Sequence, residues 1–78
     1  MGKKIYKYDK VLCKHFGKRI YALRTNCNFT QEELAFRANI SPSYMSAIER
    51  GITDTTISTA KRIAKALNVN IAQLFEND

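Results

Sequence analysis

The segment over residues 29–51, FTQEELAFRANISPSYMSAIERG, holds start signals for two short helices within a few residues of each other. Thr30 is followed three residues later by Glu33, and this capping box predicts a helix that begins just after Thr30. Ser41 is a second N-cap, and Pro42 occupies the first helical position, where its missing N–H costs nothing. The segment therefore predicts two helices joined by a tight turn.

The turn and the second helix have the residues that such a pair requires. Asn39 lies where the chain must reverse, and Asn tolerates a positive φ better than most residues do. Met45 and Ile48 lie on one face of the second helix, which ends before Gly51. Ala35 is small enough to let the two helices cross closely. The pattern predicts a helix-turn-helix.

The flanking segments predict three more helices. One runs from Asp9 or Lys10 to about Asn26 and is closed by Asn28 in a left-handed conformation. Another begins after Thr56, and a short last helix begins after Asn70. The inward residues are expected to be Leu12, Phe16, Ile20 and Leu23 in the first helix; Ile57, Ala60, Ile63, Ala64 and Leu67 in the fourth; and Ile71, Leu74 and Phe75 in the last. The expected fold class is all-α, a compact five-helix bundle without a sheet.

Composition limits the class of protein. Seventy-eight residues permit one domain, and a chain this short buries only about 60% of its unfolded surface. We expect a basic arm over residues 1–10 and a folded domain over 11–78. No apolar stretch approaches the roughly 20 residues of a membrane span, and no signal peptide opens the chain, so we expect a soluble, cytoplasmic protein. Cys13 and Cys27 fit that compartment as free thiols.

The sequence offers no set of residues for catalysis or for a cofactor. Cys13 and His15 are two poorly spaced candidates for a metal site that needs about four ligands. Nothing near Cys27 marks an activated thiolate. Glu49 has no second carboxylate, metal cluster or nucleophile–base pair beside it. We therefore expect neither an enzyme nor a cofactor.

The positive charge is concentrated in the first half of the chain. Residues 1–39 carry nine Lys or Arg and three acidic residues, whereas residues 40–78 carry four of each, so the net charge of +6 belongs to the first half. A solvated face would be the simple explanation. Beside a helix-turn-helix, a polyanionic partner is the better one, and nucleic acid is the expected ligand.

Three stretches, TQEELA, ISPSYMSAIERG and IAKALNVNIAQLF, together resemble the Xre/Cro-type family of phage repressors and their bacterial relatives. The resemblance runs from about Phe16 to Phe75. It departs from the family pattern where Asn28 and Asn39 replace the commoner glycine, and Asn can supply the same backbone conformation. The resemblance implies a lambda repressor-like DNA-binding domain, encoded by a bacterium or a phage, that binds an operator in double-stranded DNA as a homodimer.

In such a domain the second helix of the motif enters the major groove. The groove-facing residues are then expected to be Pro42, Ser43, Ser46 and Ala47, with Tyr44 on the flank and Arg50 at the far end. These small side chains discriminate weakly between bases, so Tyr44, shape readout and half-site spacing should carry more of the specificity. A solvated helix face is the alternative for the two serines. The phosphate anchors are expected to be Gln31, by resemblance, and Arg50, Thr55 and Thr56.

The resemblance also implies an ion pair between Arg24 and Glu49 that ties the first helix to the recognition helix. Phe36 occupies a position that is usually polar in the family, and it either packs under the N-terminal arm or is a lone exposed residue. We place the dimer interface at the end of the fourth helix and on the last helix, with Val69, Ile71 and Phe75 as candidates.

The expected function is a sequence-specific transcription regulator. Because the chain ends at Asp78, soon after the last core position, no effector domain and no small-molecule effector are expected. The small format resembles Cro-like repressors and the controller proteins of restriction–modification systems. The alternative is an antitoxin that binds a toxin protein and autoregulates its operon.

Overall fold

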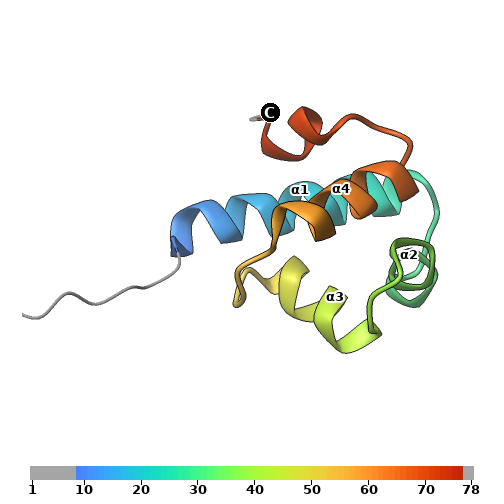
Figure 1. Cartoon of the computed structure of the whole chain (residues 1–78), viewed down its shortest axis with the longest axis horizontal. Coiled ribbons are helices and arrows are strands. Elements are labelled where there is room, and N and C mark those ends of the chain that lie inside the picture. Colours follow the sequence, from blue (N-terminus) through green and yellow to red (C-terminus); the bar gives the residue numbers. More distant parts are fainter. Residues whose placement is uncertain (1–8, 77–78) are drawn as a thin grey trace, which may run out of the picture.

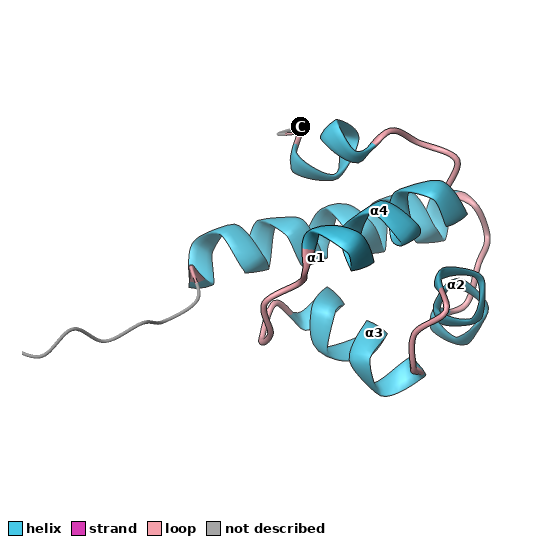
Figure 2. Ribbon diagram, viewed as in Figure 1, coloured by secondary structure: helices cyan, strands magenta, loops and turns pink. Residues whose placement is uncertain are grey.

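The computed structural model describes residues 9–76, which form four α-helices and one 3₁₀ helix (Figure 1). In chain order these are α1 (Lys10–Asn26), α2 (Gln31–Ala38), α3 (Pro42–Arg50), α4 (Ile57–Ala66) and the 3₁₀ helix η1 (Ile71–Phe75). The described part of the chain contains no strand (Figure 2), so the all-α class is confirmed. None of its helices is long and apolar enough to cross a bilayer. The N-terminal arm lies outside the described residues except for its last two, and Lys10 is the first residue of α1.

The predicted bounds of α1 are confirmed. The Asp9 side chain accepts a hydrogen bond from the Leu12 amide at 3.0 Å and caps the helix. At the other end Asn28 has a φ of 60°, the left-handed conformation expected for it. Leu12 was predicted to face inward with the other apolar residues of this helix, and this prediction is wrong because Leu12 is 47% exposed. The helix extends past the rest of the bundle there, and so its first turn is covered only in part (Figure 1).

The helix-turn-helix has the predicted caps. Thr30 and Glu33 form the full capping box of α2, and Asn39 follows with a φ of 59°. Ser41 caps α3, and Gly51 ends it with a φ of 73°. The first helix of this pair packs against both α3 and α4, while α3 also packs against α1. The two caps and the left-handed Asn39 therefore fix the angle at which α3 leaves the bundle.

Two glycines allow the end of α3 to approach α1 closely. A Cβ on Gly17 would overlap the carbonyl oxygens of Ile48 and Glu49, and a Cβ on Gly51 would overlap the backbone of Lys14. The last turn of α3 is thus held against the middle of α1 without intervening side chains.

Helix α4 is capped by Thr56 as predicted, but the prediction is wrong for one of the residues that were expected to face inward. Ile57 is 82% exposed, and Thr59 is buried instead. Thr59 can be buried because its hydroxyl has two partners: Thr56 Oγ1 at 2.9 Å and Arg62 Nη2 at 3.3 Å. Ile57 occupies the first turn, about 60° around the helix axis from Ala60, at the edge of the buried face.

The last element is a 3₁₀ helix rather than an α-helix, and a third left-handed asparagine, Asn68 (φ 59°), precedes it. Asn70 and Gln73 form its capping box. Arg19 of α1 donates to the Gln73 carbonyl at 2.8 Å. The ring of Phe75 lies 5.1 Å from that of Phe16. Phe75 was expected to face inward, but it is 46% exposed because only one side of its ring is covered. These contacts attach the C-terminal segment to α1.

The core lies where the four α-helices and η1 converge. Its largest fully buried side chains are Ile20, Leu34, Met45, Ile48, Ile63 and Leu74. Each of the five elements contributes at least one of them, so the position of α3 depends on the whole bundle.

Candidate nucleic-acid interface

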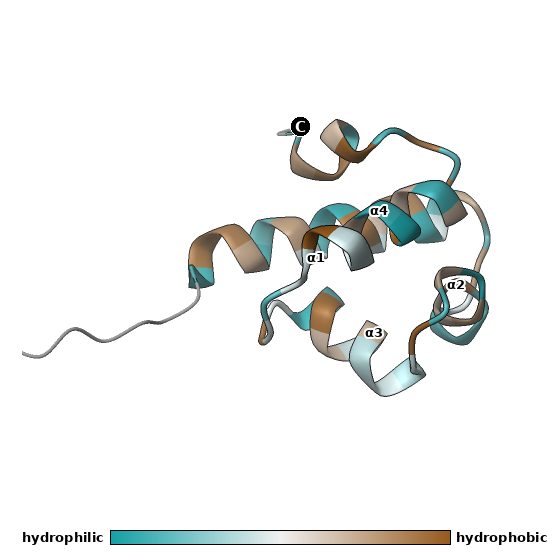
Figure 3. Ribbon diagram, in the orientation of Figure 1, coloured by the Kyte–Doolittle hydropathy of each residue, from teal (hydrophilic) through white to brown (hydrophobic). Residues whose placement is uncertain are grey.

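Helix α3 shows a face of small side chains to solvent. The Ser41 hydroxyl accepts a hydrogen bond from the Tyr44 amide at 3.1 Å and fixes the first turn. Met45 and Ile48 are 0% and 1% exposed, as predicted, and anchor the helix to the core. The ribbon of α3 in Figure 3 accordingly turns from brown at its core side to pale at its outer edge. The helix is thus held rigidly by one face while the other is available to a ligand.

The predicted groove-facing residues differ in how far they are exposed. Pro42 and Ser43, in the first turn, are exposed, whereas Ser46 and Ala47 are partly exposed. Tyr44 is partly buried and packs against the core, so its ring is anchored rather than projecting freely. The structure therefore gathers the four small residues on one surface and places Tyr44 at its border.

Arg50 and the two threonines lie at the far end of this surface. Arg50 is exposed on the last turn of α3. The Thr56 hydroxyl is occupied as a cap by the Thr59 amide at 3.1 Å. Thr55 is partly buried and lines a small pocket with Leu12 and Phe75. The hydroxyl of Thr56 is thus already used inside the fold, and a ligand there would meet backbone N–H groups.

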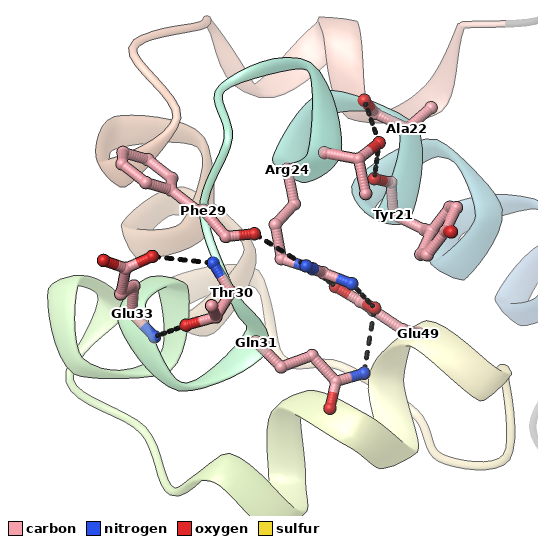
Figure 4. Close-up of polar contacts among 9 residues, drawn as sticks. Tyr21, Ala22, Arg24, Phe29, Thr30, Gln31, Glu33 and Glu49 are labelled. Atoms are coloured by element: carbon pink, nitrogen blue, oxygen red, sulfur yellow. Dashed lines mark hydrogen bonds and ion pairs between the residues drawn. The ribbon is translucent and has the colours of Figure 1, made fainter.

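A buried ion pair joins α1 to α3, as the resemblance implied (Figure 4). Arg24 Nε donates to Glu49 Oε2 at 2.6 Å, and Arg24 Nη2 donates to Oε1 at 3.1 Å. The Arg24 and Glu49 side chains are only 11% and 4% exposed. Arg24 Nη1 also donates to the Phe29 carbonyl at 2.7 Å, so the guanidinium links three segments. Hydrogen bonding to Glu49 raises the pKa of Arg24 above its usual value, which favours the charged guanidinium.

Gln31 joins this pair, a contact that the sequence did not predict. Its Nε2 donates to Glu49 Oε1 at 3.0 Å. A carboxylate can only accept, so the amide orientation is fixed by chemistry: one N–H is used by Glu49 and the second remains. Figure 4 shows the amide oxygen on the side away from Glu49. Glu49 therefore holds Gln31, the first residue of α2, in one orientation.

Several apolar side chains stay exposed around the loop between α3 and α4. Ile52 is 48% exposed, Ile57 82%, Leu12 47% and Phe75 46%. Val69 and Ile71, which we expected at a dimer interface, are partly buried and pack against the core. Phe36 stands apart on α2 and is 86% exposed; the arm that it was suggested to meet lies outside the described residues.

The described residues hold no group of three or more His, Cys, Asp or Glu side chains that could bind a metal ion. The charged groups near α3 are instead an ion pair closed within the fold and an exposed arginine at the helix end. The surface is suited to binding by hydrogen bonds and charge.

Fold and surface together define a helix-turn-helix protein of the class of DNA-binding transcription regulators. Residues 20–74 match the family model HTH_3, described as helix-turn-helix, and the chain belongs to that family.

The family includes relatives of several kinds. The immunity repressor of Bacillus phage phi105 is 38% identical over 58 residues, which are 74% of this chain but only 40% of the repressor. The restriction-modification controller protein C.AhdI from Aeromonas hydrophila has a similar structure, with a TM-score of 0.80 and 33% identity over 81% of this chain and 96% of that one. The biofilm regulator SinR, solved in complex with DNA, gives a TM-score of 0.74 and 31% identity over 78% of this chain and 98% of its own.

Proposed function

We propose that the protein binds an operator in double-stranded DNA as a homodimer, with α3 in the major groove, and regulates transcription in the cytoplasm of a bacterium. The observation that carries this proposal is the exposed face of α3, which the core and the Arg24–Glu49 pair hold in place. The likeness to C.AhdI over nearly the whole of that chain favours a controller-type regulator, and the phage repressor is a second precedent.

Base reading would rest on few hydrogen bonds. Ser43 and Ser46 can donate to or accept from any base edge, whereas Pro42 and Ala47 offer only apolar contact, most simply to thymine methyl groups. A protein of this kind gains specificity from DNA shape and from the spacing of two half-sites. Tyr44 would support this surface from its border.

Phosphate anchoring would fall to Gln31, Arg50 and the start of α4. Glu49 uses one N–H of the Gln31 amide, and we propose that the second N–H donates to a phosphate. Arg50 is exposed at the end of α3, where it can reach the backbone that flanks the groove. The backbone amides near Thr55 and Thr56 would add donors at a helix N-terminus.

We place the dimer contact on the exposed apolar residues around the loop between α3 and α4, namely Leu12, Ile52, Ile57 and Phe75. Of the residues expected from sequence, Phe75 belongs to this group, while Val69 and Ile71 already pack in the monomer. A twofold contact here would bring together the loop ends of two α3 helices.

The test is binding to a selected operator at several salt concentrations. We expect log K to fall with log salt by about 0.9 for each phosphate that the protein neutralises. Gln31→Ala and Arg50→Ala should weaken binding to all sequences alike, whereas Ser43→Ala should change which bases are tolerated. Lys18→Ala, on the exposed side of α1, is the control for loss of a charge or side chain elsewhere. The proposal would be contradicted by an affinity that does not change with salt concentration. It would also be contradicted if Ser43→Ala selected the same operator sequence as wild type.

A further inference from the structure

A second basic surface lies on α2 and α4, apart from the exposed face of α3. It consists of Arg37 from the last turn of α2 and of Lys61, Arg62 and Lys65 from α4. Arg37, Arg62 and Lys65 line one hollow together with Ala66. In Figure 3 the α4 ribbon, which lies above α3 in this view, contains the teal segments of its hydrophilic residues. We call these four residues the α2–α4 basic patch.

Its two arginines are held in place by contacts within the fold. The Arg37 guanidinium lies over the Phe29 ring, 4.5 Å from the centroid. Arg62 Nε donates to the Ala38 carbonyl at 2.9 Å, at the C-terminus of α2. Because both guanidinium groups are already ordered, a ligand that binds them loses little conformational entropy.

The patch has no acidic partner within the described part of the chain. None of its four residues takes part in an ion pair there. Helix α4 contains no acidic residue, and Glu33, four residues before Arg37, accepts from the Thr30 amide in the capping box. Like charges four residues apart on a helix, as at Lys61 and Lys65, destabilise it slightly. The fold therefore bears a small cost that a bound polyanion would reverse.

Arg37 and Lys65 lie on the side of the bundle away from the proposed dimer contact, whereas Lys61 is one helical turn from Ile57. In Figure 1, α4 runs from the α3–α4 loop at one end to the region of α2 at the other. The contact between Arg62 and the Ala38 carbonyl holds the middle of α4 beside the C-terminus of α2. If two copies meet at their loop ends, each patch lies at the outer end of the dimer, where a duplex that leaves a half-site passes.

We propose that the α2–α4 basic patch binds phosphates of the duplex outside the operator, and that flanking DNA bends toward the protein to reach it. The hollow is lined by three cations and one alanine, without an aromatic or large apolar anchor of the kind that dominates protein–protein hot spots. Phosphodiester groups are recognised by such charge alone. The inference rests on the proposed function and adds a second DNA contact to it.

The experiment compares two duplexes with the same selected operator. The short one spans only the two half-sites, about two turns of DNA, and the long one adds about one turn on each side. We expect wild-type protein to bind the long duplex several-fold more tightly and with a steeper salt dependence, by about 0.9 per added phosphate contact. The double variant Arg37→Gln/Lys65→Gln should bind both duplexes equally, and its affinity for the short duplex should match wild type. Both substitutions leave the Arg62 contact intact.

The matched control is Lys10→Gln/Lys18→Gln, which removes the same charge from exposed positions on α1. It should retain the length dependence. Equal loss in the control would show a net-charge effect and overturn the proposal. Equal wild-type affinity for the two lengths would also overturn it while leaving the proposed function intact, whereas failure of wild type to bind any duplex would refute the proposed function itself. A third outcome would also overturn the proposal. If wild type binds polyglutamate, the double variant binds it more weakly, and duplex length has no effect on affinity for DNA, then the patch binds an acidic protein instead. Thermal melts of each variant verify folding.

Discussion

At the scale of single residues, Arg24 joins α1 to α3 through a buried ion pair. Its guanidinium makes two hydrogen bonds to Glu49 and one to the Phe29 carbonyl, and it is nearly buried. We expect Arg24→Ala to lower the free energy of unfolding by roughly 3 kcal/mol, because it leaves the buried carboxylate without its countercharge.

Urea unfolding measures this effect directly. Arg24→Lys keeps the charge but cannot make the bidentate contact, so it should give an intermediate loss. Lys18→Ala serves as the control for truncation of a long exposed side chain. An unchanged midpoint for Arg24→Ala would show that the pair does not stabilise the fold.

The two cysteines should differ in reactivity. Burial, followed by the nearby carboxylate of Asp54, raises the pKa of the Cys13 thiol above its usual value, while Cys27 is exposed. At mildly alkaline pH one thiol per chain should react quickly with a disulfide reagent, and the second should react slowly. Cys27→Ser should remove the fast phase. Two equally fast phases would contradict the burial of Cys13.

The same shift makes stability depend on pH. The folded state holds the Cys13 proton more tightly than the unfolded state does, so this contribution is complete below the unfolded pKa of about 8.5. It is lost as pH rises through the higher pKa of the folded state. Cys13→Ala should show a smaller loss of stability above that pH than wild type, as measured by urea midpoints.

At the scale of helices and turns, local signals were sufficient for most element bounds. The caps at Thr30, Ser41 and Thr56 and the left-handed Asn28 and Asn39 were all predicted, because each depends on a side chain and its immediate neighbours. The left-handed conformation of Asn68 was not predicted. The same rule applies there: Asn70 was used to predict the start of η1, but no left-handed residue was assigned to the end of α4.

Helical periodicity predicted which residues are buried less well than the local signals predicted the helix bounds. It assigns an angle around the axis but not the extent of the neighbouring element, and so Leu12 and Ile57 were wrongly placed inside. Both lie in the first turn of their helices, where the bundle no longer covers the face. Thr59 was missed because its burial depends on partners supplied by Thr56 and Arg62.

The crossing of α1 and α3 leads to a prediction at Gly17. An alanine methyl group there would overlap the carbonyl oxygens of Ile48 and Glu49, which are backbone atoms and cannot rotate away. We expect Gly17→Ala to cost about 1–3 kcal/mol of stability, as overpacking commonly does. Ala22→Gly, at an exposed position of the same helix, should cost about 1 kcal/mol through helix propensity alone. A Gly17→Ala protein as stable as wild type would show that α3 can move away from α1 freely.

At the scale of the whole molecule, the candidate site was predicted in part. The alternation of buried Met45 and Ile48 with small residues was enough to predict the outward face of α3. The contact from Gln31 to Glu49 could not be predicted, because it joins α2 to α3 across 18 positions and depends on where Arg24 fixes the carboxylate. Long-range polar contacts of this kind follow from the assembled bundle rather than from any local pattern.

We propose a task for each of three exposed surfaces: the exposed face of α3, the α2–α4 basic patch, and the apolar residues around the α3–α4 loop. A test of the third surface uses Ile57, which is 82% exposed and so is not needed by the monomer core. At micromolar concentration we expect sedimentation to show a dimer for wild type and a monomer for Ile57→Asp. Sedimentation is the readout because a carboxylate beside Thr56 would also repel a phosphate at the start of α4 and so would weaken operator binding in a monomer too.

The matched control is Phe36→Asp, which places the same charge on an apolar residue that is 86% exposed on α2. It should remain dimeric, since the proposed contact does not include α2. Wild type should also unfold at a higher temperature as protein concentration rises, because a dimer gains stability by mass action, and Ile57→Asp should lose this dependence. A dimer that persists in Ile57→Asp but dissociates in Phe36→Asp would place the contact on α2 instead, and the outer position assigned to the basic patch would no longer hold.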